Sequence, residues 1–269
     1  MARLFSISAA VAALMASAAS SAYAQESAPP GQDWVLAEVP ERKAVVAMAE
    51  FDNGISLASR CMDGVFEVTL HGLPEVRGPS RTLQIAVGEE EPYDTAWTVG
   101  QVRTAAFSRV PARFARELAK GGRLQIRVPG QRGAPATRYI MELDPSGSAI
   151  EQTLTACGRS MVDLRCQSLG DEIEAGLPAG ITWSSPPQVE FPSAVKGRVP
   201  TVGFVTVTCV ARSTGRVEQC EVESEHPGGY KMGQSVVQAA LRARLRSTER
   251  NVPIPDRRTI MFTTHFRLQ

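Results

Sequence analysis

Hydrophobic and polar residues alternate most regularly in the last third of the chain. Residues 202–212 and 216–224 both alternate, and Thr214-Gly215 stands between them, which predicts a β-hairpin. If these two residues form the turn, Cys209 faces Cys220 on the apolar side of the hairpin. Opposed residues of an antiparallel pair lie about 4.5–5.5 Å apart, which is within disulfide range. We therefore expect a Cys209–Cys220 bridge, the alternative being two small buried thiols.

The hydrophobic pattern supports the same register as the cysteines. A slip of one residue would send the apolar side chains of one strand to the wrong face. The expected pairs are Val207 with Val222 on the apolar face, and Thr208 with Glu221 and Thr206 with Glu223 on the polar face.

A helix and a final strand follow the hairpin. Apolar residues at i, i+4 spacing predict a helix from about 234 to 246. Its apolar face is expected to contain Val237, Leu241 and Leu245, with Val236 and Ala240 beside them. Prolines at positions 253 and 255 exclude a helix there. Alternation then predicts a strand from about 258 to 268, whose polar side contains Thr259, Met261, Thr263, His265 and Arg267.

Residues 33–159 show short strand-like runs separated by turn signals. The clearest runs are 55–61, 65–70, 81–87, 123–128 and 138–143. Helices are expected at about 112–120, ended by Gly121-Gly122, and at about 148–156. We interpret 33–159 as a β-rich domain of unknown function, 160–186 as a linker and 187–269 as a second domain. The chain of 269 residues is long enough for both cores, and the expected fold class is α+β.

The amino-terminal residues resemble an export signal. Arg3 precedes an apolar run from Leu4 to Ala16, and small residues lead to Ala22-Tyr23-Ala24. This layout predicts that residues 1–24 are a signal peptide cleaved before Gln25, which places the protein in the periplasm. The apolar run is shorter than the about 20 residues of a membrane-spanning helix. If it were retained, the segment would instead anchor the chain in the inner membrane.

Cysteines in an exported chain are first interpreted as disulfides, and this chain has five. None of them forms a CxxC pair. Cys61 lies at the end of a predicted strand and Cys157 at the end of a predicted helix, so we expect a second bridge between them. Cys166, in the expected linker, is left as the odd thiol.

The net charge of +1 conceals an uneven distribution. Residues 190–269 contain 12 Lys and Arg against 7 Asp and Glu, whereas residues 25–189 contain 16 against 21. The basic excess favours an anionic partner, although a chance distribution of solvated side chains explains it equally well. The excess is too small to indicate nucleic acid.

No motif in the sequence indicates catalysis. His71, His226 and His265 are far apart and lack metal-binding spacing, and the chain contains no G-x-S-x-G, P-loop or G-x-G-x-x-G. We therefore expect no catalytic residues, metal or cofactor. An envelope hydrolase with a site assembled from distant residues of 33–159 stays open as an alternative.

Residues 187–268 resemble the C-terminal domain of TonB. The segment Pro187-Gln188-Val189-Glu190-Phe191-Pro192-Ser193-Ala194 is similar to the P-x-Y-P-x-x-A signature of that family, with Phe191 in place of Tyr. Four further elements follow in the family's order: Gly197-Arg198-Val199, Gly215-Arg216-Val217, Ala239-Ala240-Leu241 and Phe266-Arg267-Leu268. The family's Pro-rich spacer is missing, and Ala243-Arg244-Leu245-Arg246 stands where Trp-x-Phe is frequent.

The resemblance implies a protein that binds a partner by adding an extended peptide to a sheet edge. The final strand is the expected edge, and its partner would be a protein or peptide, including a segment of an outer-membrane receptor. A strand that closes its own sheet, or that of a homodimer, is the alternative. We interpret the chain as a periplasmic binding or adaptor protein rather than an enzyme. A membrane-anchored energy transducer for outer-membrane transport is the other function that the resemblance implies.

Overall fold

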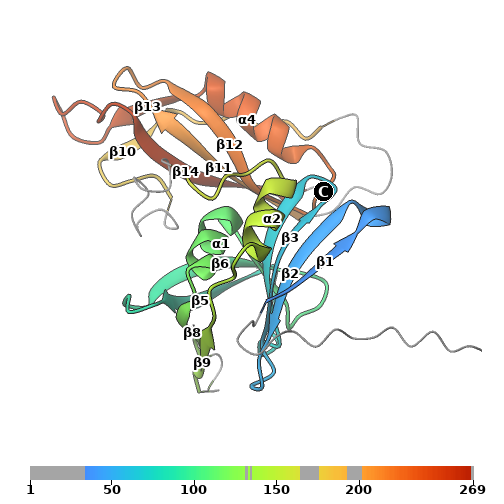
Figure 1. Ribbon diagram of the computed structural model, residues 1–269. Helices are drawn as coiled ribbons and strands as arrows, with labels where there is room; N and C mark the ends of the chain where they lie inside the picture. The colour runs from blue at the N-terminus through green and yellow to red at the C-terminus, as the bar shows by residue number, and fades with distance from the viewer. Residues whose placement is uncertain (1–33, 131–132, 134, 164–175, 193–201, 268–269) are drawn as a thin grey trace, which may run out of the picture.

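The computed structural model describes residues 34–130, 133, 135–163, 176–192 and 202–267, and the expected signal peptide and Cys166 lie outside them. The fold is α+β, as the sequence predicts, and is built on antiparallel sheets. We call residues 34–163 the first half of the chain and residues 176–267 the second half. Figure 1 shows the second half packed above the helices of the first half. Two separate hydrophobic clusters, one from Trp34 to Leu154 and one from Ile181 to Phe266, form the cores.

A nine-stranded antiparallel sheet forms the first half, in the order β1-β2-β3-β4-β7-β6-β5-β8-β9. The strands are β1 (Val35–Val39), β2 (Ala44–Glu50), β3 (Ser56–Met62), β4 (Val65–His71), β5 (Ser80–Val87), β6 (Tyr93–Val99), β7 (Ala106–Ser108), β8 (Gly122–Val128) and β9 (Thr137–Leu143). In β8, Leu124, Ile126 and Val128 are buried, whereas Arg123 and Arg127 are exposed. This period of two is what the sequence pattern predicts for a strand.

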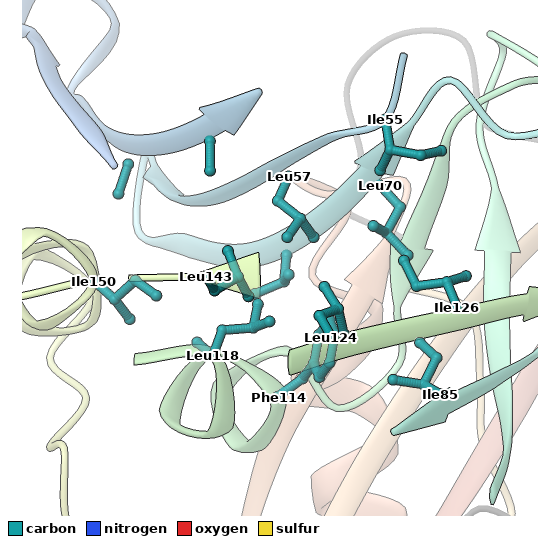
Figure 2. Packing of buried hydrophobic residues seen from close by; sticks show 14 of the residues in the cluster. Ile55, Leu57, Leu70, Ile85, Phe114, Leu118, Leu124, Ile126, Leu143 and Ile150 are labelled. Atoms are coloured by element: carbon teal, nitrogen blue, oxygen red, sulfur yellow. The ribbon is translucent and has the colours of Figure 1, made fainter. Parts of the chain in front are cut away.

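Two helices cover one face of this sheet: α1 (Pro111–Ala119) and α2 (Ala149–Ala156). Both begin and end within one residue of the ranges expected from sequence. Figure 1 shows the sheet bending around them, and Figure 2 shows Leu118 of α1 and Ile150 of α2 pointing toward Leu57 and Leu143. The first core is therefore a layer of aliphatic side chains between sheet and helices.

A disulfide and a buried hydrogen bond join α2 to β3. Cys61 and Cys157 are bridged, with their Cα atoms 5.5 Å apart, which confirms the predicted pair. The hydroxyl oxygens of Ser59 and Thr153 lie 2.7 Å apart and are buried. Residues that follow α2 thus start from a fixed position.

The second half contains a three-stranded sheet, a two-stranded ribbon and a helix. The elements are β10 (Ile181–Ser185), β11 (Val202–Ala211), β12 (Val217–His226), α4 (Met232–Arg242), β13 (Arg244–Ser247) and β14 (Arg258–Arg267). The strand order is β12-β11-β14 in the sheet, and β10 pairs with β13 in the ribbon. The helix contacts β12 and β11, while Trp183 and Phe191 pack edge-on against Phe262 and Phe266 of β14.

The predicted hairpin register holds at the centre of β11 and β12 and shifts on either side. Val207 pairs with Val222 and Thr208 with Glu221 as expected, and Cys209 is bridged to Cys220 with a Cα–Cα distance of 4.1 Å. Thr206, however, pairs with Ser224 rather than Glu223, because the register shifts between Thr206 and Val207. A second shift lies between Thr208 and Val210. Such bulges insert one residue and increase the local twist of a strand.

The predicted helix 234–246 is displaced toward the amino terminus. The structure has α4 at Met232–Arg242, and Leu245 lies in β13, where its N–H donates to the carbonyl of Gly215 at 2.8 Å. Pairing with β10 therefore replaces the last helical turn. The expected apolar face is wrong for Leu241, which is 47% exposed, whereas Val236, Ala239 and Ala240 are buried.

The expected linker, 160–186, also differs from the structure. Its last residues form β10, and Leu177, Ile181 and Trp183 pack into the second core. The short alternation of Ile181 and Trp183 was hidden among neighbouring Ser, Gly and Pro. None of the described helices is long and apolar enough to cross a membrane.

Candidate functional site

Strand β14 forms one edge of the three-stranded sheet. It pairs with β11 without interruption, from Val202 opposite Arg267 to Ala211 opposite Arg258. Within the described residues, no strand pairs with its other side. Since alternate residues of an antiparallel strand direct N–H and C=O to opposite sides, about half of the backbone groups of β14 face this open edge.

The five residues predicted to meet a partner differ in their access to solvent. Thr259 and Met261 are each only 3% exposed, so their side chains do not face a partner. Thr263 is half-buried, and its hydroxyl lies 3.1 Å from that of Thr206. His265 and Arg267 are exposed. The accessible part of β14 is therefore its carboxyl-terminal half, residues 263–267.

His265 lies at the border of this accessible half. Its ring packs edge-on against Phe204, with centroids 4.8 Å apart. Partial burial lowers the pKa of His265, and Arg109 and Arg267 lower it further because they repel a second positive charge. A neutral imidazole is the favoured form at neutral pH.

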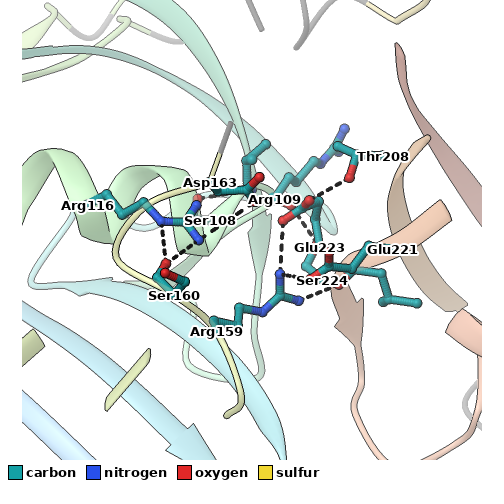
Figure 3. Close-up of polar contacts among 12 residues, drawn as sticks. Ser108, Arg109, Arg116, Arg159, Ser160, Asp163, Thr208, Glu221, Glu223 and Ser224 are labelled. Carbon is teal, nitrogen blue, oxygen red and sulfur yellow. Dashed lines mark hydrogen bonds and ion pairs between the residues drawn. The ribbon is translucent and has the colours of Figure 1, made fainter. Parts of the chain in front are cut away.

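The opposite edge of the sheet, β12, contacts the first half of the chain. Arg159, three residues after α2, reaches Glu221 at 2.8 Å and Glu223 at 3.4 Å and donates to the backbone carbonyl of Val222. The Ser224 hydroxyl donates to the carbonyl of Arg109 at 2.8 Å. Figure 3 shows these groups converging from both halves of the chain.

The ion pairs of Arg159 are largely shielded from water. The side chains of Arg159 and Glu223 are only 13% and 6% exposed, whereas that of Glu221 is 40% exposed. Glu223 also accepts a hydrogen bond from the Thr208 hydroxyl at 2.6 Å. A buried carboxylate with both a cationic and a hydroxyl partner is well satisfied.

Nearby, Arg116 holds the chain segment that follows Arg159. Its guanidinium donates twice to the carbonyl of Ser160, at 2.9 and 2.7 Å, and lies 3.8 Å from Asp163. Arg116 belongs to α1, so it ties the segment that carries Arg159 to the first core.

A second group of contacts lies beside β4 and β7. The ring of His226 lies 4.9 Å from that of Phe107, and burial lowers its pKa. A small cavity between the two halves is lined by both residues and by Glu67 and Ser224. Arg60 forms a 2.6 Å ion pair with Glu67, one of the residues that line this cavity.

The three histidines come from different strands: His71 ends β4, His226 ends β12 and His265 lies in β14. The ring Nε2 of His71 lies 3.1 Å from the hydroxyl oxygen of Thr69. Burial lowers the pKa of His71, and Arg60 lowers it further. Among the described residues, no group of three or more His, Cys, Asp or Glu side chains could hold a metal ion. Sequence reasoning did not identify the contacts of Arg159 and Ser224, because the partners are separated by 62 and 115 residues.

Comparisons with known proteins add little. No protein-family model matches the chain, and no curated protein matches it. Among solved structures, the C-terminal domain of TonB from Pseudomonas aeruginosa, determined by solution NMR, is similar at 20% identity. The match covers 34% of this chain and 88% of that domain, with a TM-score of 0.27. A likeness this distant does not place the chain in the family, and the TonB resemblance stays an expectation from the sequence.

Proposed function

We propose that the protein is an exported binding or adaptor protein of the periplasm, whose second half captures an extended peptide by adding it to β14. The observation that carries this proposal is the uninterrupted edge of β14, which has its pairing partner on one side only within the described chain. Unpaired N–H and C=O groups in a row are a template for a further strand.

The accessible half of the strand defines the kind of partner. Residues 263–267 are five positions, which offer about 16 Å of edge to a peptide in extended conformation. The side chains of Thr263 and His265 beside that edge are small or polar, whereas Phe266 on the other face is buried in the second core. A segment of another protein, such as an outer-membrane receptor, fits such an edge, and a second copy of this chain is the competing occupant.

Proline substitutions test the open edge directly. Of the neighbours Thr264 and His265, one directs its N–H to β11 and the other to the open edge. Thr264→Pro and His265→Pro are made separately, and the variant that keeps the wild-type melting temperature identifies the outward N–H. Peptides selected from a phage-displayed library of random dodecapeptides against the wild type should bind that variant about tenfold more weakly or worse, since a hydrogen bond and steric fit are lost.

Amide hydrogen exchange gives the control. A selected peptide should slow exchange at the outward amides of residues 263–267 and leave the inward amides unchanged. Equal binding by the wild type and the stable proline variant would refute strand addition. Wild-type protein that dimerises through the same amides would show that β14 pairs with its own copy instead.

A further inference from the structure

Arginines gather at the end of the second half of the chain where β14 begins. The hairpin turn between β11 and β12, the carboxyl end of α4, β13 and the loop that follows it all contribute. We call this surface the basic end, and it comprises Arg212, Arg216, Arg242, Arg244, Arg246, Arg250, Arg257 and Arg258.

Hydrogen bonds bring these separate segments together. The N–H of Leu245 donates to the carbonyl of Gly215 at 2.8 Å, which places Arg244 and Arg246 beside the hairpin turn. The carboxylate of Asp256 accepts from the Ser213 N–H at 3.0 Å and from Arg212 at 2.9 Å, which draws the later loop to the same turn. Figure 1 shows both loops projecting from one end of the second half.

Few carboxylates offset this charge. Glu218 and Asp256 both pair with Arg212, at 2.7 and 2.9 Å, and Glu249 is the other acidic residue of these segments. Within the described residues, no ion pair engages the five exposed arginines at positions 216, 242, 246, 250 and 257. Their side chains are exposed to solvent and leave this surface with a net positive charge.

Two exposed aliphatic side chains lie among the arginines. Leu241, beside Arg242 in the last turn of α4, is 47% exposed, and Val252, two residues after Arg250, is 48% exposed. Anionic bilayers attract clustered Arg and Lys and also accept apolar side chains at the interface. Phosphate groups alone would make no use of the aliphatic side chains.

We propose that the basic end docks on a bilayer surface that contains anionic phospholipid. This inference goes beyond peptide capture and does not depend on it. The accessible residues 263–267 lie toward the other end of β14 from Arg258, about 16–30 Å along the strand. Contact of the basic end with lipid therefore leaves the open edge free, and one molecule can hold a peptide at a membrane surface.

The test compares vesicle binding by the full-length wild type and a triple variant, Arg216→Gln, Arg246→Gln and Arg257→Gln. Co-sedimentation is measured with vesicles of pure phosphatidylcholine and with vesicles in which a third of the lipid is phosphatidylglycerol. A basic side chain near an anionic surface strengthens binding by about fivefold, so the triple variant should bind the anionic vesicles about 100-fold more weakly. Raising the salt well above about 0.1 M should weaken wild-type binding in the same direction.

A matched control removes the same charge elsewhere. Arg42, Arg77 and Arg127 are exposed residues of the first half, and changing all three to Gln should leave vesicle binding within about twofold of the wild type, as expected for charges beyond a Debye length from the bilayer. Equal loss in both triple variants would overturn the proposal, because net charge alone would then explain binding. Wild-type binding that is equal on neutral and anionic vesicles would also overturn it, as would tighter binding to an oligonucleotide than to the anionic vesicles. Peptide capture by β14 is measured without vesicles, so either proposal can fail alone.

Discussion

Arg159 connects the two halves of the chain through a small number of well-defined contacts. It follows α2, whose end is fixed by the Cys61–Cys157 bridge, and its guanidinium reaches Glu221, Glu223 and a backbone carbonyl of β12. Because Glu223 is buried, the ion pair with Arg159 helps to stabilise its charge.

Replacement of Arg159 by alanine should destabilise the protein by about 3 kcal/mol, since it removes one cationic partner of a buried carboxylate and a hydrogen bond to the backbone. Urea unfolding monitored by tryptophan fluorescence measures the effect. Glu221→Gln is the matched control: its side chain is 40% exposed, so its loss should cost less than about 1 kcal/mol. Equal midpoints for the two variants would show that the interface does not rest on the buried pair.

The contacts of single residues could be predicted from the sequence where both partners lie in one short segment with a clear pattern. The Cys209–Cys220 bridge followed from alternation around one turn, and the structure confirms it. The Arg159 contacts had no such signal, because charged residues are frequent on any surface and their pairing depends on how distant segments pack. The burial of Thr259 and Met261 was missed because both lie on a face that the sequence pattern marks as polar.

At the scale of elements, the hairpin turn depends on one close backbone approach. Gly215 has φ of +78°, and a Cβ atom there would lie 2.4 Å from the carbonyl oxygen of Leu245. Only glycine satisfies both conditions, so the turn between β11 and β12 can pack directly on β13.

Gly215→Ala should therefore lower the free energy of unfolding by about 2–3 kcal/mol, through left-handed strain together with a clash against backbone. Gly229 has a similar φ of +87° but no atom within 4 Å of its would-be Cβ. Gly229→Ala should cost only about 1 kcal/mol, which isolates the strain. Thermal unfolding of both variants checks the difference, and equal costs would argue against the close packing of β13.

Most strands and helices could be predicted because local periodicity determines which face is buried. α1 and α2 agree with the pattern within one residue, and so do the strongest strands. The end of α4 could not be predicted in this way, since Leu245 continues the helical spacing but is taken by pairing with β10. Tertiary pairing overrides a local preference that amounts to only a fraction of a kcal/mol per residue.

For the molecule as a whole, the two disulfides should contribute unequally to stability. Cys61 and Cys157 are 96 residues apart, whereas Cys209 and Cys220 are 11 residues apart. The loop-entropy relation gives about 5 kcal/mol for the long loop and about 3 kcal/mol for the short one.

Paired Cys→Ser variants, Cys61 with Cys157 and Cys209 with Cys220, test this order by urea unfolding. A larger loss of stability when the short loop is opened would mean that native-state packing, rather than constraint of the unfolded chain, governs the effect.

Intact mass before and after reduction and alkylation confirms that the remaining bridge has formed, and it also shows whether the exported chain begins at Gln25. Retention of residues 1–24 would contradict the proposed export with cleavage.

The packing of the two halves against each other has one consequence for assembly. At β12, Arg159 occupies the carbonyl of Val222, and two register shifts distort the strand, so this side of the sheet cannot accept another strand as β14 can. Because only one edge of this three-stranded sheet can pair with an added strand, a strand bound there cannot be followed by another at the opposite edge. Association through β14, as proposed, would therefore be self-limiting and would stop at one bound peptide or one dimer.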